Sequence, residues 1–242
     1  MNAFTDQIAV ITGASSGMGK AIALGLAQQG ATVCLIGRNP ETLRTVIEIT
    51  QALAPKSRWY QADLTIEGDV REVAQRIGQD FESVDILIHS AGFIALDRIE
   101  TASLQDFDRH YLTNVRAPYL LTQTLLPLLK VRRGQIVFIN SSAGLNAKAN
   151  TGQYAASKHA LKAIADSLRE EINADGIRVL SIYPGRTATP MQATVHEAEG
   201  REYHPEMLMQ PEDVVAVVIN ALSLPNSAEV TDIIIRPLTK PN

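Results

Sequence analysis

A tyrosine and a lysine lie four positions apart in Tyr154-Ala155-Ala156-Ser157-Lys158, inside a stretch from about 152 to 174 that is typical of a helix. Residues at i and i+4 share one face of a helix, so the phenol and the ammonium should lie side by side. A lysine charge favours the phenolate and should lower the tyrosine pKa from its usual value of about 10. The pair is a candidate general acid/base, although most such pairs are a packed tyrosine beside a solvated lysine.

A second motif, Thr12-Gly13-Ala14-Ser15-Ser16-Gly17-Met18-Gly19, lies near the start of the chain. It follows the apolar run from Ile8 to Ile11, which is typical of a buried strand, and precedes a stretch that is typical of a helix and stops at Gly30. A strand, a glycine-rich turn and a helix form the context of a dinucleotide site, because glycines allow the backbone to approach a pyrophosphate and a helix N-terminus offers free N–H groups. The alternative is an ordinary tight turn.

Together the two motifs resemble the short-chain dehydrogenase/reductase family in its single-domain form, and the resemblance covers nearly the whole chain. His89-Ser90-Ala91-Gly92 occupies the place of the family's Asn-Asn-Ala-Gly signature, and Leu112-Thr113-Asn114-Val115 is similar to the segment of its helix asparagine. Ser141 lies thirteen positions before Tyr154, which is the family's spacing for its catalytic serine and favours Ser141 over Ser142.

The resemblance implies hydride transfer between a nicotinamide and a carbonyl or carbinol carbon. Tyr154 would move the proton, Lys158 would lower the pKa of Tyr154 and bind the nicotinamide ribose, and Ser141 would hold the substrate oxygen. Asn114 would brace a water that relays protons toward Lys158. The departure at His89-Ser90 leaves open which hydrogen bonds brace the central strands.

The choice of cofactor can be argued from the second predicted strand, which ends Leu35-Ile36-Gly37-Arg38-Asn39 with no acid. An acid there would bind the ribose 2′-hydroxyl and repel a 2′-phosphate, whereas Arg38 can pair with that phosphate and stack on adenine. We therefore expect NADP(H), the alternative being that Arg38 is a solvated charge. By resemblance Asp63 contacts adenine, although a helix-capping aspartate would look the same. The residues expected to contact the cofactor are Gly13, Ser15, Ser16, Gly17, Met18, Gly19, Arg38, Asp63, Leu64, Ser90, Ala91, Gly92, Tyr154, Lys158, Pro184, Gly185, Thr187 and Thr189.

Strand and helix signals alternate along the whole chain, which predicts a single doubly wound, Rossmann-like α/β domain over 1–242. Its parallel sheet should have about seven strands, with helices on both faces. The predicted strands are 7–12, 31–36, 57–61, 84–89, 134–140, 177–183 and 229–236, and the predicted helices are 17–29, 40–53, 67–81, 103–131, 152–174 and 211–223.

The stretch from Gly185 to Gln210 interrupts this alternation with Pro190, Gly200 and Pro205. Long irregular insertions are usually functional, so we expect 186–210 to be a substrate lid. The role of Arg186 is left open. The candidate site residues Gly13, Arg38, Asp63, Gly92, Ser141 and Gly185 all follow directly after predicted strands, at the edge of a parallel sheet where ligands bind.

Composition narrows the classes of partner. A net charge of −4 with no basic stripe argues against nucleic acid, and no apolar run is long enough to span a membrane. The first strand begins near residue 7, which leaves no room for a targeting segment, and the single cysteine, Cys34, lies in an apolar strand, so we expect a cytoplasmic protein. The five histidines are scattered and predict no metal site.

The preferred function is an NADP(H)-dependent carbonyl reductase or alcohol dehydrogenase acting on a small molecule. The alternatives are a catalytically silent nucleotide-binding regulator or scaffold, and a lyase or epimerase that keeps its cofactor. The segments 93–98, 145–151 and 186–206 should set substrate specificity, but their mixed composition leaves the substrate and the direction of reaction open. The apolar helix 103–131 predicts a homo-oligomer, a tetramer rather than a dimer, unless that helix is buried within one chain.

Overall fold

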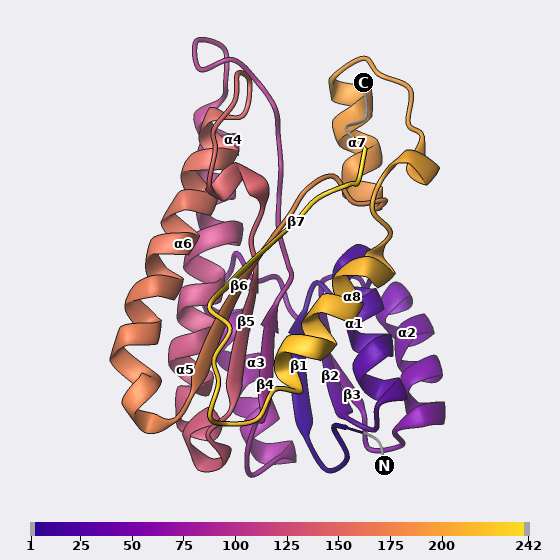
Figure 1. Cartoon of the computed structure of the whole chain (residues 1–242), viewed down its shortest axis with the longest axis vertical. Helices are drawn as coiled ribbons and strands as arrows, with labels where there is room; N and C mark the ends of the chain where they lie inside the picture. Colours follow the sequence, from indigo (N-terminus) through magenta and orange to yellow (C-terminus); the bar gives the residue numbers. More distant parts are fainter. Residues whose placement is uncertain (1–2, 240–242) are drawn as a thin grey trace.

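The computed structural model describes residues 3–239. Its centre is a seven-stranded sheet of order β3-β2-β1-β4-β5-β6-β7, in which every neighbouring pair is parallel (Figure 1). The predicted doubly wound α/β fold is confirmed. The strands are β1 (Ile8–Thr12), β2 (Thr32–Gly37), β3 (Arg58–Gln61), β4 (Ile86–His89), β5 (Gln135–Ile139), β6 (Arg178–Pro184) and β7 (Asp232–Ile235).

Helices cover both faces of the sheet. Figure 1 shows α3, α5 and α6 on one face and α1, α2 and α8 on the other. Alternate strand residues supply the two cores: Val10 and Phe138 face the first group of helices, and Ile11 and Val137 face the second. The helices are α1 (Gly17–Gln28), α2 (Pro40–Leu53), α3 (Glu67–Asp80), α4 (Leu104–Tyr111), α5 (Ala117–Arg132), α6 (Gly152–Ile172), α7 (Pro190–Ala198) and α8 (Pro211–Leu222).

The strand order reverses between β1 and β4. From β1 the chain builds outward to β3, and from β4 it builds outward to β7 on the other side. The two sets of crossover helices therefore diverge at the carboxyl ends of β1 and β4 and leave a crevice there.

The helix predicted over 103–131 is interrupted. Between α4 and α5, Leu112–Arg116 forms a single π-helical turn that contains Asn114. Pro118 contributes to this interruption because it has no N–H to donate to the carbonyl four residues earlier, which is that of Asn114. π turns of this kind often mark functional sites.

The stretch 185–210 is more regular than its composition predicted, because it contains α7 and a 3₁₀ turn at Pro205–Met207. The sequence did carry a start signal for α7: the Thr189 hydroxyl caps the helix by accepting the Gln192 N–H at 3.2 Å, and Pro190 occupies its first position. This segment therefore stands beside the crevice as a helix.

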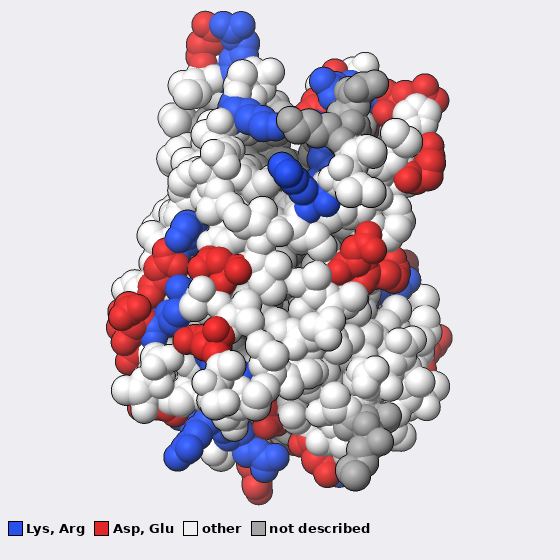
Figure 2. Space-filling view, viewed as in Figure 1, with Lys and Arg blue, Asp and Glu red and all other residues white. Residues whose placement is uncertain are grey.

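Several apolar residues of α5 that suggested an oligomer are buried within the chain itself, including Leu121, Leu125 and Leu129. The large apolar side chains of this region that remain exposed are Leu104, Phe107, Tyr111, Tyr119 and Val131. Figure 2 shows charges of both signs interspersed on the face it presents. Across residues 3–239, every helix is too short or too polar to cross a membrane.

Candidate active site

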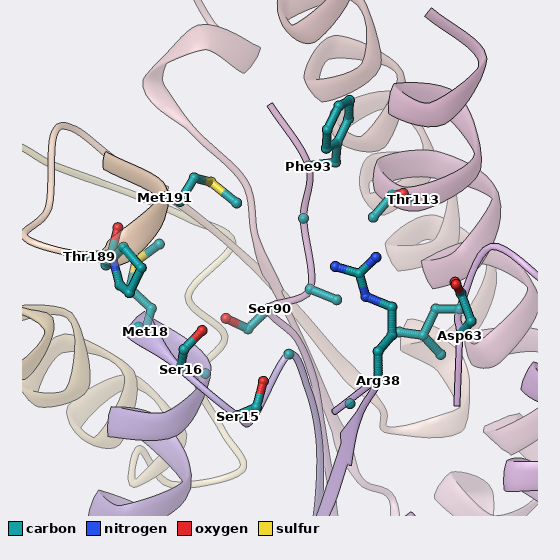
Figure 3. A pocket seen from close by; sticks show the side chains of 18 of the residues that line it. Ser15, Ser16, Met18, Arg38, Asp63, Ser90, Phe93, Thr113, Thr189 and Met191 are labelled. Atoms are coloured by element: carbon teal, nitrogen blue, oxygen red, sulfur yellow. The ribbon is translucent and has the colours of Figure 1, made fainter. Parts of the chain in front are cut away.

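A cleft opens at the carboxyl ends of β1, β2 and β4. Figure 3 shows Arg38 and Asp63 on one side of it, Thr189 and Met191 on the other, and Ser90 between them. The residues that line it are Gly13, Ser15, Ser16, Gly17, Met18, Gly19, Gly37, Arg38, Ala62, Asp63, Leu64, Thr65, Ser90, Ala91, Gly92, Phe93, Arg109, Thr113, Thr189, Pro190 and Met191.

The glycine turn is shaped by close backbone contacts. Gly13 has a φ of 65°, and a Cβ there would lie 2.9 Å from the backbone of Ala91. A Cβ on Gly19 would overlap the Gly13 carbonyl. Only glycine fits at these two positions, so the turn lies flat against the end of β4 and leaves the first N–H groups of α1 facing the cleft.

Thr12 ties the glycine turn to β4. Its hydroxyl oxygen accepts the N–H groups of Ser90 at 3.0 Å and of Ala91 at 3.1 Å, and it donates to the Ile88 carbonyl at 3.4 Å. The Ser90 hydroxyl is buried at the cleft wall and has no hydrogen-bond partner among residues 3–239. A buried polar atom without a partner is costly, so this hydroxyl is available to a ligand in the cleft.

Charged side chains gather at the β2 end of the cleft. Asp63 accepts the N–H and the hydroxyl of Thr65 at 2.9 and 2.8 Å. Burial opposes ionisation of Asp63, but these two hydrogen bonds and the charges of Arg38 and Arg109 hold its pKa below the ordinary value. The carboxylate is therefore ionised and fixed in direction, and one of its oxygens has no hydrogen-bond donor among the described residues.

Tyr154 lies near the start of α6 and is 9% exposed. Burial raises the pKa of its phenol, and a hydrogen bond from Ser141 only partly opposes that rise. In the chain by itself the pKa of Tyr154 therefore lies above its usual value and not below it, because desolvation outweighs the hydrogen bond from Ser141, and the effect of Lys158 on this pKa stays a prediction. The tyrosine is protonated at neutral pH.

Lys158 is buried in the same wall, with its ammonium 5.9 Å from the centre of the Tyr154 ring. The Nζ atom donates to the Ile139 carbonyl at 3.1 Å. Burial lowers the pKa of Lys158 to about 8. The lysine is thus still mostly charged at neutral pH, close to the point at which it can release a proton.

Asn114 uses its side chain to hold the irregular segment that follows β4. Its Oδ1 accepts the Phe93 N–H at 2.8 Å, and its Nδ2 donates to the Phe93 carbonyl at 2.9 Å and to the Ser157 hydroxyl at 3.0 Å. Both amide hydrogens are occupied. The side chain is therefore a brace, and a water relay at this residue would have to use its main-chain carbonyl.

Sequence reasoning missed Asn140. It lies directly before Ser141, accepts the Ser141 N–H at 2.9 Å and donates to the Lys158 carbonyl at 3.1 Å. Gly144 permits this arrangement, because a Cβ there would come within 2.5 Å of the Asn140 oxygen. An asparagine at a strand end beside the candidate serine was the only signal available, and it was overlooked.

His110 was also missed. It is buried, its Nε2 lies 3.0 Å from the Ala95 N–H and its Nδ1 lies 2.7 Å from the Asp106 carbonyl. This pattern requires the neutral ring with its proton on Nδ1. Burial lowers the pKa of His110, which agrees with that form. The ring packs between Phe93 and Tyr154, with centroids 4.7 and 6.0 Å away, and so positions the loop that begins at Phe93.

The structure explains His89 in the place of an asparagine. Its Nε2 lies 2.8 Å from the Thr122 hydroxyl, and its ring stacks on Phe138 at 4.9 Å. Burial lowers the pKa of His89 to about 3, so it is a neutral brace between β4, β5 and α5. Ser90, not His89, faces the cleft.

The structure brings most predicted cofactor residues to the cleft wall, but not all of them. Ser141, Tyr154 and Lys158 lie in an adjoining wall that Asn114 connects to the cleft through Phe93. Pro184, Gly185 and Thr187 do not line the cleft either. Gly185 packs against Arg236 and Pro237, and Thr187 is buried and donates to the Gly185 carbonyl at 3.2 Å, so these residues support the segment before α7.

Arg186 joins the two ends of this segment. Its Nη2 lies 2.6 and 2.8 Å from the two carboxylate oxygens of Glu199, which follows α7, and its Nη1 lies 3.4 Å from His196. Burial opposes ionisation of Glu199, but Arg186 holds the pKa of Glu199 below its ordinary value. This ion pair therefore connects the residue near the start of the segment to the residue that follows α7. Among residues 3–239, no group of acidic, histidine and cysteine side chains could hold a metal.

Known proteins share this architecture and sequence. The family model described as short chain dehydrogenase matches residues 7–200. An uncharacterized oxidoreductase of Staphylococcus epidermidis is 32% identical over 96% of this chain and 98% of its own length. A short chain dehydrogenase of Shigella flexneri complexed with NADP is 33% identical, with a TM-score of 0.88 over 97% of this chain and 98% of its own. One from Escherichia coli complexed with NADPH is also 33% identical, with a TM-score of 0.88 over 96% and 98%.

Proposed function

This chain belongs to the short chain dehydrogenase family of oxidoreductases, and from that premise we propose that it is an NADP(H)-dependent enzyme interconverting a ketone or aldehyde and an alcohol. The observation that carries the proposal is one wall in which Tyr154 and Lys158 are buried and the half-buried Ser141 hydrogen-bonds Tyr154, beside a cleft of dinucleotide character. The two relatives with 33% identity bind NADP and NADPH, which supports the choice of cofactor.

The cleft residues fit such a cofactor. The glycine turn presents backbone N–H groups for a pyrophosphate, Arg38 offers a cation for a 2′-phosphate, and the unpartnered Ser90 hydroxyl offers a polar contact between them. When bound, the nicotinamide supplies or accepts the hydride. The protein's residues must then hold the substrate oxygen and move one proton.

We assign that proton to the Tyr154 hydroxyl. A phenol with a raised pKa is protonated at neutral pH and can donate to the oxygen of a carbonyl as negative charge develops there. Ser141 donates to the phenol oxygen in the free protein, and the same hydroxyl is placed to donate to a substrate oxygen that comes between them.

Lys158 has two parts in this scheme. Its charge stabilises the phenolate that remains after proton donation, and its ammonium, which uses one hydrogen for the Ile139 carbonyl, has others for a ribose hydroxyl. For the proton relay, we assign the main-chain carbonyl of Asn114 as the group that holds the water, since Pro118 leaves that carbonyl without its usual helical donor.

The alternative, a silent nucleotide-binding regulator or scaffold, is disfavoured because the acid, the lysine and the serine are all present. The test is absorbance at 340 nm, with NADPH and a panel of aldehydes, ketones and 3-oxo acids. Turnover of at least one class that Tyr154→Phe abolishes would support the enzyme. Tight NADPH binding with no turnover across the panel would support the silent alternative.

We also propose that the chain is one catalytic domain and that 186–210 acts as its substrate lid. Thr189 and Met191 line the cleft, which supports this placement. For assembly we propose a homotetramer, with the exposed Phe107, Tyr111 and Tyr119 in its interfaces. Light scattering at micromolar concentration measures this, and a mass near that of one 26.3 kDa chain would refute it.

A further inference from the structure

Two arginines, not one, border the β2 end of the cleft. Arg38 follows β2, and Figure 3 shows its side chain reaching up toward Phe93 and Thr113. Arg109 comes from α4, four positions before Thr113, and lines both the main cleft and the open hollow beside it. Arg38 and Asp63 line the same two cavities. The two guanidinium groups therefore approach one corner from different elements.

This corner has an excess of positive charge. Within the described residues, Asp63 is the carboxylate that both arginines influence, since their charges help to lower its pKa. Its Oδ1 is occupied by Thr65, and neither arginine comes within ion-pairing distance of it. Asp108 lines only the hollow beside the cleft, whereas the charged residues that line the main cleft are Arg38, Arg109 and Asp63, which leave it a net charge of about +1. A dianionic group placed there would be attracted by both arginines.

Arg109 is also held in a fixed place. Its guanidinium carbon lies 4.0 Å from the centre of the Phe93 ring, and Phe93 is anchored at its backbone by Asn114. A guanidinium stacked on an aromatic ring keeps its N–H groups free at the edges. Less rotamer freedom is then lost when those N–H groups bind an anion.

We propose that Arg109 is a second specificity-determining residue of the adenosine end, and that it shares recognition of a ribose 2′-phosphate with Arg38. The inference rests on the proposed function, because it assigns Arg109 to the NADP(H) site. An alternative role is purely structural: Arg109 packs on Phe93 and has no part in choosing the cofactor.

The experiment is a fluorescence titration of NADPH and of NADH, with 2′,5′-ADP and 5′-ADP as second probes by calorimetry. Arg109→Gln should raise the Kd of NADPH and of 2′,5′-ADP about fivefold, the size expected for one exposed charge pair, and change NADH and 5′-ADP less than twofold. Arg109→Lys should recover part of the loss. The dependence of the NADPH Kd on salt should become shallower in Arg109→Gln.

The control is Arg98→Gln, which removes an exposed arginine that pairs with Glu100 at 2.7 Å and lies outside the cleft wall. Arg98→Gln should leave the Kd values of NADPH and NADH unchanged. Phe93→Leu separates the two roles. If Arg109 has only a packing role, Phe93→Leu and Arg109→Gln should each raise the Kd of NADPH and the Kd of NADH by equal factors. That result would overturn the inference.

The inference and the proposed function fail in different ways. If the unmodified protein prefers NADPH and Arg109→Gln keeps that preference in full, only the role of Arg109 is wrong. If the unmodified protein binds neither cofactor or prefers NADH, the proposed cofactor choice falls, and the inference falls with it.

Discussion

The cofactor cradle and the catalytic wall adjoin each other but are built in different ways. We define the cradle as Thr12–Gly19 with Ser90–Gly92, and the wall as Ser141, Tyr154 and Lys158. In the cradle, backbone groups make the close contacts, and apart from Met18 the side chains are small or absent. In the wall, long side chains are buried, and their pKa values are set by desolvation.

This difference predicts how each region should respond to substitutions. Because the cradle is built from backbone, added side-chain volume should distort it. A change in its shape or in the charge at its rim should therefore change the affinity for the cofactor. A side-chain-built wall is sensitive to the loss of a single atom, because one hydroxyl or ammonium carries the chemistry while packing stays the same. Substitutions can therefore separate binding from turnover, and four of them test that separation.

The largest effect is expected from Tyr154→Phe, which removes one oxygen from the wall. The ring and its packing beside His110 remain, so the Kd of NADPH should change little. If Tyr154 is the proton donor, as proposed, kcat should fall at least about a hundredfold. Steady-state kinetics on a verified substrate measure this, with the exposed Tyr119→Phe as control. A variant that kept half of the normal kcat would remove the acid/base assignment.

The next effect is expected from Arg38→Asp, which changes the charge at the rim of the cradle. Loss of a charge-assisted phosphate pair should cost about 2 kcal/mol, so the Kd of NADPH should rise about thirtyfold and the preference should turn to NADH. The kcat with NADH should stay close to that of the unmodified protein, since the wall is untouched. Equal titration curves for NADPH and NADH with the unmodified protein would contradict the proposal that Arg38 pairs with the 2′-phosphate.

Gly19→Ala tests the shape of the cradle instead of its charge. The added Cβ would overlap the Gly13 carbonyl, so the turn must shift. We expect both cofactors to weaken together by about tenfold, consistent with a cost of 1–3 kcal/mol for overpacking. Gly68→Ala, with open space around its Cβ, is the matched control. If only the binding of NADPH weakened, the shape of the glycine turn would not be what the two cofactors share in binding.

The smallest effect is expected on stability, from Lys158→Met. The pKa of Lys158 lies at about 8 in the folded chain against 10.5 for the unperturbed group, so the folded state binds the proton less well than the unfolded state. Burying this charge therefore costs stability below pH 8, and the cost disappears as the pH rises from about 8 to 10.5. After loss of the hydrogen bond to Ile139, Lys158→Met should be more stable by about 1 kcal/mol at pH 7, although inactive.

Urea unfolding at pH 7 and at pH 10 measures that difference. The advantage of Lys158→Met should shrink at pH 10. Lys162→Met, one turn further along α6, removes a partly exposed lysine that pairs with Asp166, and it should show no such gain. A lower stability for Lys158→Met at pH 7 would mean that the lysine stabilises the fold and that its burial is not strained.

Much of the site could be predicted from local sequence. Gly13 and Gly19 lie between a predicted strand and a predicted helix, and this pattern can be recognised within about a dozen residues. Arg38 at a strand end was equally visible. Arg109, Asn140 and His110 were not, because an arginine, asparagine or histidine in a helix or loop has no local signal that shows which cavity it borders.

The sequence by itself determined the order and type of the strands and helices, because apolar runs, glycines and capping residues act over a few neighbouring residues. It also determined which side chains follow the strands, and therefore which end of the sheet binds a ligand. Only the tertiary structure decided the direction of the Tyr154 pKa, the pairing of Arg186 with Glu199 and the junction of His89 with Thr122. Each of these depends on desolvation or on a partner brought close by folding, and neither can be read from spacing along the chain.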